Sequence, residues 1–382
     1  MGVYINTGTA GFESLRNDNY VDKSMLIAHV NSLINTDQRF ICVSRMRRCG
    51  KSVSAYMLES YYMETVDSRT LFDDLQIAQD PSYATHRNRY PTIFLDLTGF
   101  LPVTKGRSQM VEAISPSLIR NLHDEYPDVN LDGETDLLLA LHKVTQHTGK
   151  KFIMFVDEWD MFIREHYTMP GLVDEYFDLL RHLFCSPESK DIFALVYMTG
   201  IMPIKKFDNQ SGLPNFIEST MLNPGPLAPF FSFSADEVRT LCQNNNIDYA
   251  TMCDWFDGYQ FGNLTHRFNP VAVVKTIWHE RFQPYWSQTG SWHTIEDFVS
   301  MPYEGLKEAT LQLVSGESIP VDVTTCQNDM HVVRSKDEAL TTLILLGYLT
   351  FDCNTSTCHI PNQDVASAFG IVTRVLKWVK EY

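Results

Sequence analysis

The sequence predicts an α/β fold in which a parallel sheet, covered by helices on both faces, forms the first part of the chain. Four short runs rich in strand-forming residues are apolar almost throughout, as expected of strands buried on both faces. Segments of helix length separate these runs, and parallel strands need such crossover connections. The alternation stops after a Pro-rich segment. The four strand candidates are residues 39–44, 91–100, 151–160 and 191–200, and the Pro-rich segment is 222–234.

Helical patterns precede and connect these strands. Apolar residues recur at helical spacing from Met25 to Ile34, after a start at Asp22 or Ser24. The first strand leads through a basic turn into another helical pattern. The helical patterns that follow the strands are about residues 51–66, 110–126, 134–146 and 172–185.

The rest of the chain differs in character. Ser234 is expected to cap a helix, and the chain then reads as helical, with aromatic-rich connections, to about residue 292. Beyond it, residues 347–352 and 358–362 predict a hairpin, which is followed by a C-terminal helix. We therefore expect three domains, which are residues 1–230, 231–292 and 293–382.

Composition restricts the class of protein. The chain of 382 residues is 44% hydrophobic, enough to build two or three packed domains. Its formal net charge of −16 repels a phosphate backbone, so nucleic acid is a disfavoured partner, although Arg374, Lys377 and Lys380 form a local basic cluster. Eight scattered cysteines without a Cys-x-x-Cys pair, and the lack of a signal peptide or membrane span, predict a cytoplasmic protein with no membrane partner.

A phosphate-binding loop (P-loop) is predicted between the first strand and its helix. The segment Ser-Arg-Met-Arg-Arg-Cys-Gly-Lys-Ser, residues 44–52, stands where backbone N–H groups of a turn and a helix N-terminus can face phosphates. Lys51 would neutralise the β and γ oxygens and Ser52 would ligate Mg²⁺. A lysine in the first helical turn opposes the helix dipole, so a capping role explains it poorly. The residues expected to bind nucleotide here are Arg45, Met46, Arg47, Arg48, Cys49, Gly50, Lys51, Ser52 and Val53.

Acidic residues end the third strand. Asp157 would hold Mg²⁺, and Glu158 would be the general base that orients the attacking water. Thr199, at the end of the fourth strand, could contact the γ-phosphate or that water. Because the carboxyl ends of parallel strands meet at one edge of a sheet, these side chains are expected to converge with Lys51. The sequence thus predicts an Mg-ATP site.

Most of these residues also have a structural alternative. Asp157 and Glu158 could cap the helix that follows the strand, and Thr199 could be an ordinary strand-end residue. Arg47 and Arg48 could brace the γ-phosphate, or could be solvated charges of the loop. The functional interpretation is favoured because several roles agree at one place.

These motifs together resemble the bacterial predicted AAA-ATPase family. The family's loop typically reads T-R-P-R-R-F-G-K-S/T, which this chain matches from Arg45 to Ser52 except at Met46 and Cys49. The usual P-loop begins with Gly at the position of Arg45, and arginine at this position is typical of the family. Further segments resemble family blocks in the same order: Y-V-D-K at 20–23, V-D-E-W-D at 156–160, and M-T-G-I-M-P-I-K-K at 198–206 with Pro203 in place of Arg. Later blocks are 230–238, 255–262, 268–270, 346–350 and 360–365.

The resemblance implies a P-loop NTPase of the AAA-like and signal-transduction type. Residues 231–292 would then be a helical lid, residues 293–382 a winged-helix-like region, and the cofactors ATP or ADP with Mg²⁺. It also makes Tyr20 a candidate for stacking on adenine, although the ring could equally belong to the core. Family members often continue into a PD-(D/E)XK nuclease-like domain, which the sequence to Tyr382 lacks, so we expect no nuclease activity.

Two functions based on nucleotide binding remain open, and a disfavoured third is DNA binding by the C-terminal winged-helix-like region through Arg374, Lys377 and Lys380. The favoured one is an ATPase or ATP-gated switch that hydrolyses ATP slowly. The alternative is a nucleotide-bound scaffold without hydrolysis, which acts with a separately encoded effector, another protein or nucleic acid. Oligomerisation is compatible with both.

Overall fold

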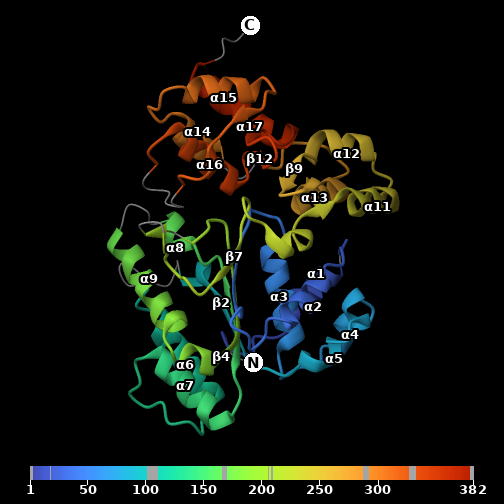
Figure 1. The fold of residues 1–382 in the computed structure, drawn as a ribbon. Helices are drawn as coiled ribbons and strands as arrows, with labels where there is room; N and C mark the ends of the chain where they lie inside the picture. The colour runs from blue at the N-terminus through green and yellow to red at the C-terminus, as the bar shows by residue number, and fades with distance from the viewer. Residues whose placement is uncertain are drawn as a thin grey trace. The chain divides into compact units, whose positions relative to one another are not determined.

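The computed structural model describes residues 3–17, 19–100, 111–165, 170–204, 206–207, 210–286, 292–326 and 333–378. The chain forms two compact units (Figure 1). The first unit is Met1–Ser44 with Lys51–Glu218, and the second is Arg45–Gly50 with Ser219–Tyr382. The chain therefore leaves the first unit for six residues, in the segment expected to bind phosphate, and then returns to it.

A five-stranded sheet forms the centre of the first unit. Its order is β2-β3-β4-β1-β7, and the neighbours β2 and β3, β3 and β4, and β4 and β1 are parallel. The first four strands are buried over almost their whole length, which confirms the prediction of a sheet covered on both faces. The strands are β1 (Phe40–Ser44), β2 (Thr92–Asp96), β3 (Phe152–Asp157), β4 (Phe193–Gly200) and β7 (Ile217–Ser219).

Helices cover both faces of this sheet. Figure 1 shows α1, α2 and α3 on one side and α6, α7 and α9 on the other. On the α3 side, Tyr56 stacks on Phe94 of β2 with ring centroids 5.0 Å apart. The remaining elements of the first unit are α1 (Ala10–Arg16), α2 (Met25–Asn31), α3 (Lys51–Tyr62), α4 (Arg69–Phe72), η1 (Gln76–Gln79), α5 (Tyr83–His86), η2 (Leu97–Phe100), α6 (Ile114–Glu125), α7 (Leu137–Thr148), α8 (Met161–Glu165), α9 (Pro170–Cys185), α10 (Ser189–Ile192), β5 (Lys206–Phe207) and β6 (Gln210–Ser211).

The second unit begins with helices around a small antiparallel sheet of order β8-β10-β9. Ser234 caps α11 in a capping box with Glu237, as the sequence predicts. The small sheet was not predicted, because strands of two to five residues are too short to show alternation. The elements here are η4 (Gly225–Phe230), β8 (Phe233–Ser234), α11 (Ala235–Asn245), α12 (Tyr249–Phe256), β9 (Tyr259–Phe261), β10 (Leu264–Phe268) and α13 (Pro270–His279).

The end of the second unit holds the predicted hairpin, in which β12 and β13 pair antiparallel. The helix before it, α16, is buried from Glu338 to Leu346, so it presents no exposed face to a nucleic-acid groove. The winged-helix assignment stays a prediction, and Lys380 of the basic cluster lies outside the described residues. The elements are α14 (Trp292–Val299), α15 (Leu306–Val314), β11 (Ile319–Pro320), α16 (Lys336–Leu346), β12 (Thr350–Asp352), β13 (Thr357–His359) and α17 (Gln363–Val375).

The two C-terminal domains expected from the sequence lie in one compact unit. Tyr259 of β9 donates a hydrogen bond from its hydroxyl to the Gly347 carbonyl at 2.9 Å, and the Gln260 N–H donates to Thr350 Oγ1 at 2.9 Å. All eight cysteines are free thiols. In the described ranges, no helix is both long enough and apolar enough to cross a lipid bilayer.

Candidate functional site

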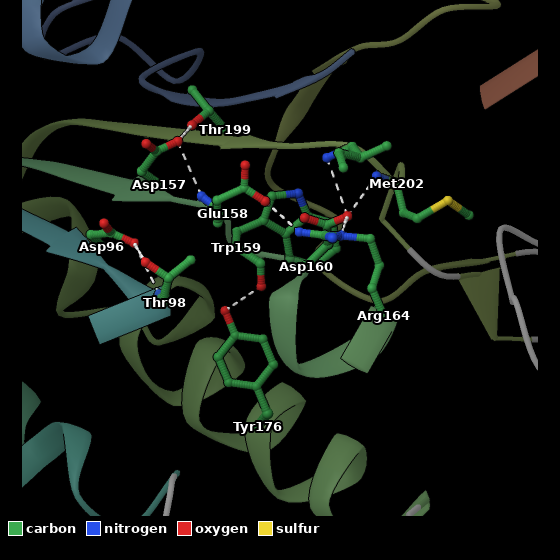
Figure 2. A network of polar contacts seen from close by, with 11 residues as sticks. Asp96, Thr98, Asp157, Glu158, Trp159, Asp160, Arg164, Tyr176, Thr199 and Met202 are labelled. Carbon is green, nitrogen blue, oxygen red and sulfur yellow. Dashed lines mark hydrogen bonds and ion pairs between the residues drawn. The ribbon is translucent and has the colours of Figure 1, made fainter. Parts of the chain in front are cut away.

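The carboxyl ends of β1, β3 and β4 lie side by side at one edge of the sheet. Strand pairing places Thr199 opposite Val43 of β1, and Met198 opposite Val156 of β3. Asp157 therefore ends β3 beside Thr199, and Thr199 Oγ1 donates a hydrogen bond to Asp157 Oδ1 (Figure 2). Both side chains are buried. The structure thus brings together the polar residues that end these two strands.

Lys51 and Ser52 open α3, the helix that follows β1 along the chain. This helix packs on β3 and β4, and Ser54 Oγ lies 3.1 Å from the Tyr197 hydroxyl of β4. Lys51 is 5% exposed, and its positive charge lowers the pKa of the Glu158 carboxyl. The first turn of such a helix also offers N–H groups without intrahelical partners. Lys51, the helix N-terminus and the acids of β3 thus share one electrostatic environment.

Glu158 has an uncommon backbone conformation directly after β3. Its φ of +53° lies in the left-handed region, which residues with a side chain rarely adopt. Its N–H donates to Asp157 Oδ1 at 3.1 Å. Burial raises the pKa of the Glu158 carboxyl, while the positive charges of Arg164 and Lys51 lower it. Backbone strain at a partly buried acid is typical of functional sites.

Sequence reasoning missed Arg164 and Asp160. Arg164, in α8, forms an ion pair with Glu158 Oε2 through Nη2 and with Asp160 Oδ2 through Nε at 2.8 Å (Figure 2). The same Asp160 oxygen accepts the N–H groups of Ile201 at 3.1 Å and Met202 at 2.7 Å. A signal was present, because an Asp and an Arg four residues apart are neighbours on a helix.

Asp96 is another carboxylate at this edge that was not singled out. It ends β2 and is in register with Asp157. Its Oδ1 accepts hydrogen bonds from the N–H and the hydroxyl of Thr98, at 2.9 and 2.7 Å, and so closes the turn after β2 (Figure 2). The sequence did contain a signal for Asp96, because β2 is an apolar strand that ends in Asp, the same pattern by which Asp157 was recognised at the end of β3.

Close packing requires a glycine at Gly200, the end of β4. A Cβ there would collide with the indole of Trp159 and would lie 2.7 Å from Asp160 Oδ1. The backbone N–H of Trp159 donates to the Thr199 carbonyl at 2.9 Å, and the Tyr176 hydroxyl donates to the backbone carbonyl of Trp159 at 2.7 Å. The end of β4 is therefore packed directly on the turn that carries the acids.

The loop Arg45–Gly50 is held within the second unit. Arg45 is fully buried, and its guanidinium is used by protein groups rather than turned toward a phosphate. Cation–π contacts add to the hydrogen bonds it donates. Its partners are the Thr220 carbonyl, Ser219 Oγ at 2.9 Å, the Pro224 carbonyl at 3.1 Å, and the rings of Phe261 and Phe231, whose centroids lie 5.3 and 5.8 Å from its guanidinium carbon.

The other loop residues are anchored in the same unit. Met46 and Cys49 are buried, Arg48 is partly buried and Arg47 is exposed. Gly50 has a φ of +101°, so the backbone rather than lack of space requires glycine there. The anchoring contacts are Met46 against Gly347, Arg48 Nη1 to the Tyr285 carbonyl at 3.3 Å, Asn269 Nδ2 to the Arg47 carbonyl at 3.2 Å, and the Ser232 N–H to the Cys49 carbonyl at 2.9 Å.

These contacts limit what each loop residue can offer a phosphate. Arg45, Met46 and Cys49 would contribute through backbone N–H groups, because their side chains are buried among protein atoms. Arg47 retains an exposed side chain. Arg48 has a φ of +66°, and its charge lies close enough to Asp364 to lower the pKa of that carboxyl, against the stronger effect of burial.

Two predicted nucleotide contacts lie outside the loop. Val53 is half-buried in the first turn of α3. The Tyr20 ring packs edge-on against Phe12 with centroids 5.6 Å apart and lies under the Arg16 guanidinium, while its hydroxyl lies 3.6 Å from Met57 Sδ. Adenine stacking by Tyr20 stays a prediction.

Ser52 and Asp157 fit a magnesium ion bound together with phosphates. Mg²⁺ usually takes one or two protein oxygens and completes its shell with water and phosphate oxygens. Among the described residues, the two hydrogen bonds to the Asp157 carboxylate both go to Oδ1, so Oδ2 could accept a metal-bound water. Within the described ranges, no group of three or more His, Cys, Asp or Glu residues could hold a metal by itself. A site completed by nucleotide suits this donor set.

Comparison with known proteins gives likenesses to individual sequences and structures, among them the following two. A protein described as "Uncharacterized protein in vnfD 5'region", from Azotobacter chroococcum mcd 1, is 25% identical over 145 residues. That match spans 37% of this chain and 28% of the relative. Among solved structures, the Aeropyrum pernix ORC2 protein in its ADPNP-ADP complexes aligns with 96% of this chain and 94% of its own, at 12% identity and a TM-score of 0.32.

A family model covers a longer part of the chain. The family described as predicted AAA-ATPase matches residues 6–209, more than half of the 382 residues. The matched range contains the P-loop segment, the acidic end of β3 and the end of β4. The chain belongs to the predicted AAA-ATPase family.

Proposed function

We propose that this chain binds Mg-ATP and hydrolyses it slowly, as an ATP-gated switch. Family membership supports nucleotide binding in general. The observation that carries the proposal is the grouping of Lys51, Asp157, Glu158 and Thr199, which come from separate elements of the first unit. No single structural role explains a buried lysine, a strained glutamate and a buried aspartate at the same sheet edge.

Each residue has a role in this proposal. Lys51 and the loop N–H groups hold the phosphates, and Arg47 and Arg48 brace them. Ser52 and Asp157 bind the magnesium ion. Magnesium supplies charge neutralisation at the β- and γ-phosphates.

The chemistry falls to the ends of β3 and β4. Glu158 accepts a proton from the attacking water, which needs an ionised carboxylate with one accessible oxygen. Thr199 contacts the γ-phosphate or that water. ATP and ADP need differ by only a few kcal/mol in their preference for two states of the chain to switch it.

Ligand identification and two variants test the proposal. Mass spectrometry of ligand released from the purified protein should find an adenine nucleotide, and titration with ATP and Mg²⁺ should give saturable binding. Lys51→Ala should weaken binding at least about tenfold, the loss of one charge-assisted contact. Glu158→Gln should bind ATP like the wild type but lose about 10²- to 10⁴-fold in turnover. Equal ATP affinity in wild type and Lys51→Ala would refute the site.

The alternative is a scaffold that keeps nucleotide as a structural ligand. It is favoured by the anchoring of Arg45 and its neighbours in the second unit, which suits a loop that orders protein around a phosphate. Glu158→Gln separates the two functions. A wild type that binds nucleotide without turnover, with Glu158→Gln indistinguishable from it, supports the scaffold.

The wider arrangement is also part of the proposal. Residues 231–292 would act as a lid and residues 293–382 as a winged-helix-like region that responds to the nucleotide state. A separately encoded effector or oligomerisation would read out the switch in the cytoplasm. Nucleic acid is a disfavoured partner, given the net charge of −16.

A further inference from the structure

A polar chain runs through the turn after β3. It begins at Glu158 Oε2, passes through the Arg164 guanidinium to Asp160 Oδ2, and ends at the N–H groups of Ile201 and Met202 (Figure 2). The Arg164 side chain is 8% exposed and that of Asp160 is 0% exposed. This series of polar contacts therefore differs from a surface ion pair, which contributes little to stability because water screens it.

The two carboxylate oxygens of Glu158 are used differently. Oε2 is held by Arg164, whereas no side chain or N–H group in the described residues donates to Oε1. A general base must present one oxygen to a water molecule in a fixed direction. An arginine that binds the other oxygen restricts rotation of the carboxylate and leaves the first available.

Asp160 connects this restraint to β4. Ile201 and Met202 follow directly after Thr199 and Gly200, so their hydrogen bonds to Asp160 fix the backbone that leaves the strand. The same carboxylate oxygen fixes Arg164. One buried group therefore sets the position of the end of β4 and, through arginine, of the acid at the end of β3.

We propose that Arg164 and Asp160 are positioning residues of the hydrolytic site: Arg164 orients Glu158 so that Oε1 faces the attacking water, and Asp160 keeps Arg164 in register with Thr199. The proposal rests on the function proposed above. Neither residue touches the nucleotide.

A purely structural role explains these contacts less well. Asp160 concentrates three donors on Oδ2, while its buried Oδ1 has no hydrogen-bond partner among the residues that the structure describes, an arrangement that costs about 1–3 kcal/mol. Glu158 in turn holds a left-handed backbone conformation. Stability alone would favour satisfying both oxygens of Asp160 and relaxing Glu158. One cost lies at Glu158, the residue proposed to activate water, and the other at Asp160, the residue proposed to hold its arginine in place.

The test compares kcat, KM and ATP affinity in Arg164→Gln, Arg164→Lys and wild type. Arg164→Gln removes the charge and the ion pairs with Glu158 and Asp160, so kcat should fall at least about tenfold, the size of effect that small misplacement of a reacting group produces. KM and the Kd for ATP should stay within about threefold, because phosphate binding is left intact. Arg164→Lys, which can reach one carboxylate but lacks the planar fork, should recover part of kcat.

A matched control separates this effect from loss of any ion pair. Arg69→Gln removes an arginine of the same unit that pairs with Asp67 at the surface, and it should leave kcat, KM and Kd at wild-type values. Thermal melts identify variants that fail to fold. If Arg164→Gln fails to fold, kcat and Kd of the lysine variant decide the question.

The outcomes distinguish this inference from the proposed function. A wild type that binds and hydrolyses ATP, with a folded Arg164→Gln variant whose kcat is within twofold of it, overturns the positioning role and leaves the ATPase proposal standing. Equal losses of kcat and ATP affinity also overturn it, since they indicate general damage to the site. A wild type that binds ATP without turnover also overturns the positioning role, because there is then no hydrolysis for Arg164 to assist. A wild type that binds no nucleotide overturns both the positioning role and the proposed function.

Discussion

Arg45 gives the sharpest prediction, because it occupies the position where most P-loops begin with glycine. If the arginine merely tolerated that position, Arg45→Gly would restore the common motif at little cost. The structure predicts the opposite. The arginine is 0% exposed and its guanidinium binds Ser219 Oγ and the carbonyls of Thr220 and Pro224. The substitution therefore leaves a cavity and takes the guanidinium donor from the Thr220 carbonyl, whereas the Pro224 carbonyl keeps the Ser219 hydroxyl as a donor.

The magnitude follows from these losses. A buried acceptor left without a donor costs about 1–3 kcal/mol, and glycine adds about 0.5–1 kcal/mol of backbone entropy. Removal of the long side chain adds a cavity term, while relief from burying a cation acts in the opposite direction. The net expectation for Arg45→Gly is a destabilisation of about 3–5 kcal/mol, or about 10 °C in Tm for a unit of this size. Arg45→Met, which refills part of the volume, should cost less.

Tryptophan fluorescence during thermal unfolding is the suitable assay. Five of the six tryptophans, all except Trp159, belong to the second unit, so the signal reports mainly on the unit that holds Arg45. The expected order of midpoints is wild type, then Arg45→Met, then Arg45→Gly. ATP affinity should fall in the glycine variant because the loop loses its anchor. A midpoint within about 1 °C of wild type, with equal or tighter nucleotide binding, would refute the anchoring role.

Two further variants test other parts of the first unit. Gly200→Ala should cost at least about 1–3 kcal/mol by overpacking and should lower turnover, because the new methyl group meets Trp159 and Asp160; unchanged melting and kcat would show that the turn adapts. Burial raises the pKa of Glu59 to about 7, so ionising it in the folded state weakens the fold as pH rises from about 4.5 to about 7. Glu59→Gln, whose side-chain carbonyl can still accept the Thr7 hydroxyl hydrogen bond, should remove this loss. Relative to wild type, the free energy of unfolding of the variant, measured by urea denaturation, should therefore be about 3 kcal/mol more favourable at pH 8 than at pH 4. A constant difference across that range would contradict the assignment.

Much of the first unit could be predicted because its signals are local. Apolar runs bounded by turn residues define β1 to β4, and the rule that parallel strands end at one edge predicts that Asp157 and Thr199 meet. The short strands β8 to β10 could not be predicted in this way. Their residues give no periodic pattern, and only tertiary packing decides their conformation.

The side-chain directions in the loop and in α8 lay beyond sequence reasoning. Arg45 was expected among the phosphate contacts, yet its guanidinium binds residues that lie about 175 positions later in the chain. Arg164 was passed over, since an arginine on a helix usually faces solvent. Its ion pairs with Glu158 and Asp160 are recognisable only when the turn after β3 is known. Residue spacing predicts which residues share a helix or strand, but it does not predict which distant backbone carbonyl accepts a hydrogen bond from a guanidinium.

The path of the chain through residues 45–50 has a practical consequence for dissecting the protein. A fragment cut at Glu218 would retain every strand of the main sheet up to its last residues, and would contain the whole range matched by the family. It would nevertheless strip Arg45, Met46 and Cys49 of the groups that cover them. In such a truncated protein, apolar side chains of the loop 45–50 would be exposed beside the proposed nucleotide site. Poor solubility or lost ligand affinity of the fragment would therefore say nothing about the intact chain.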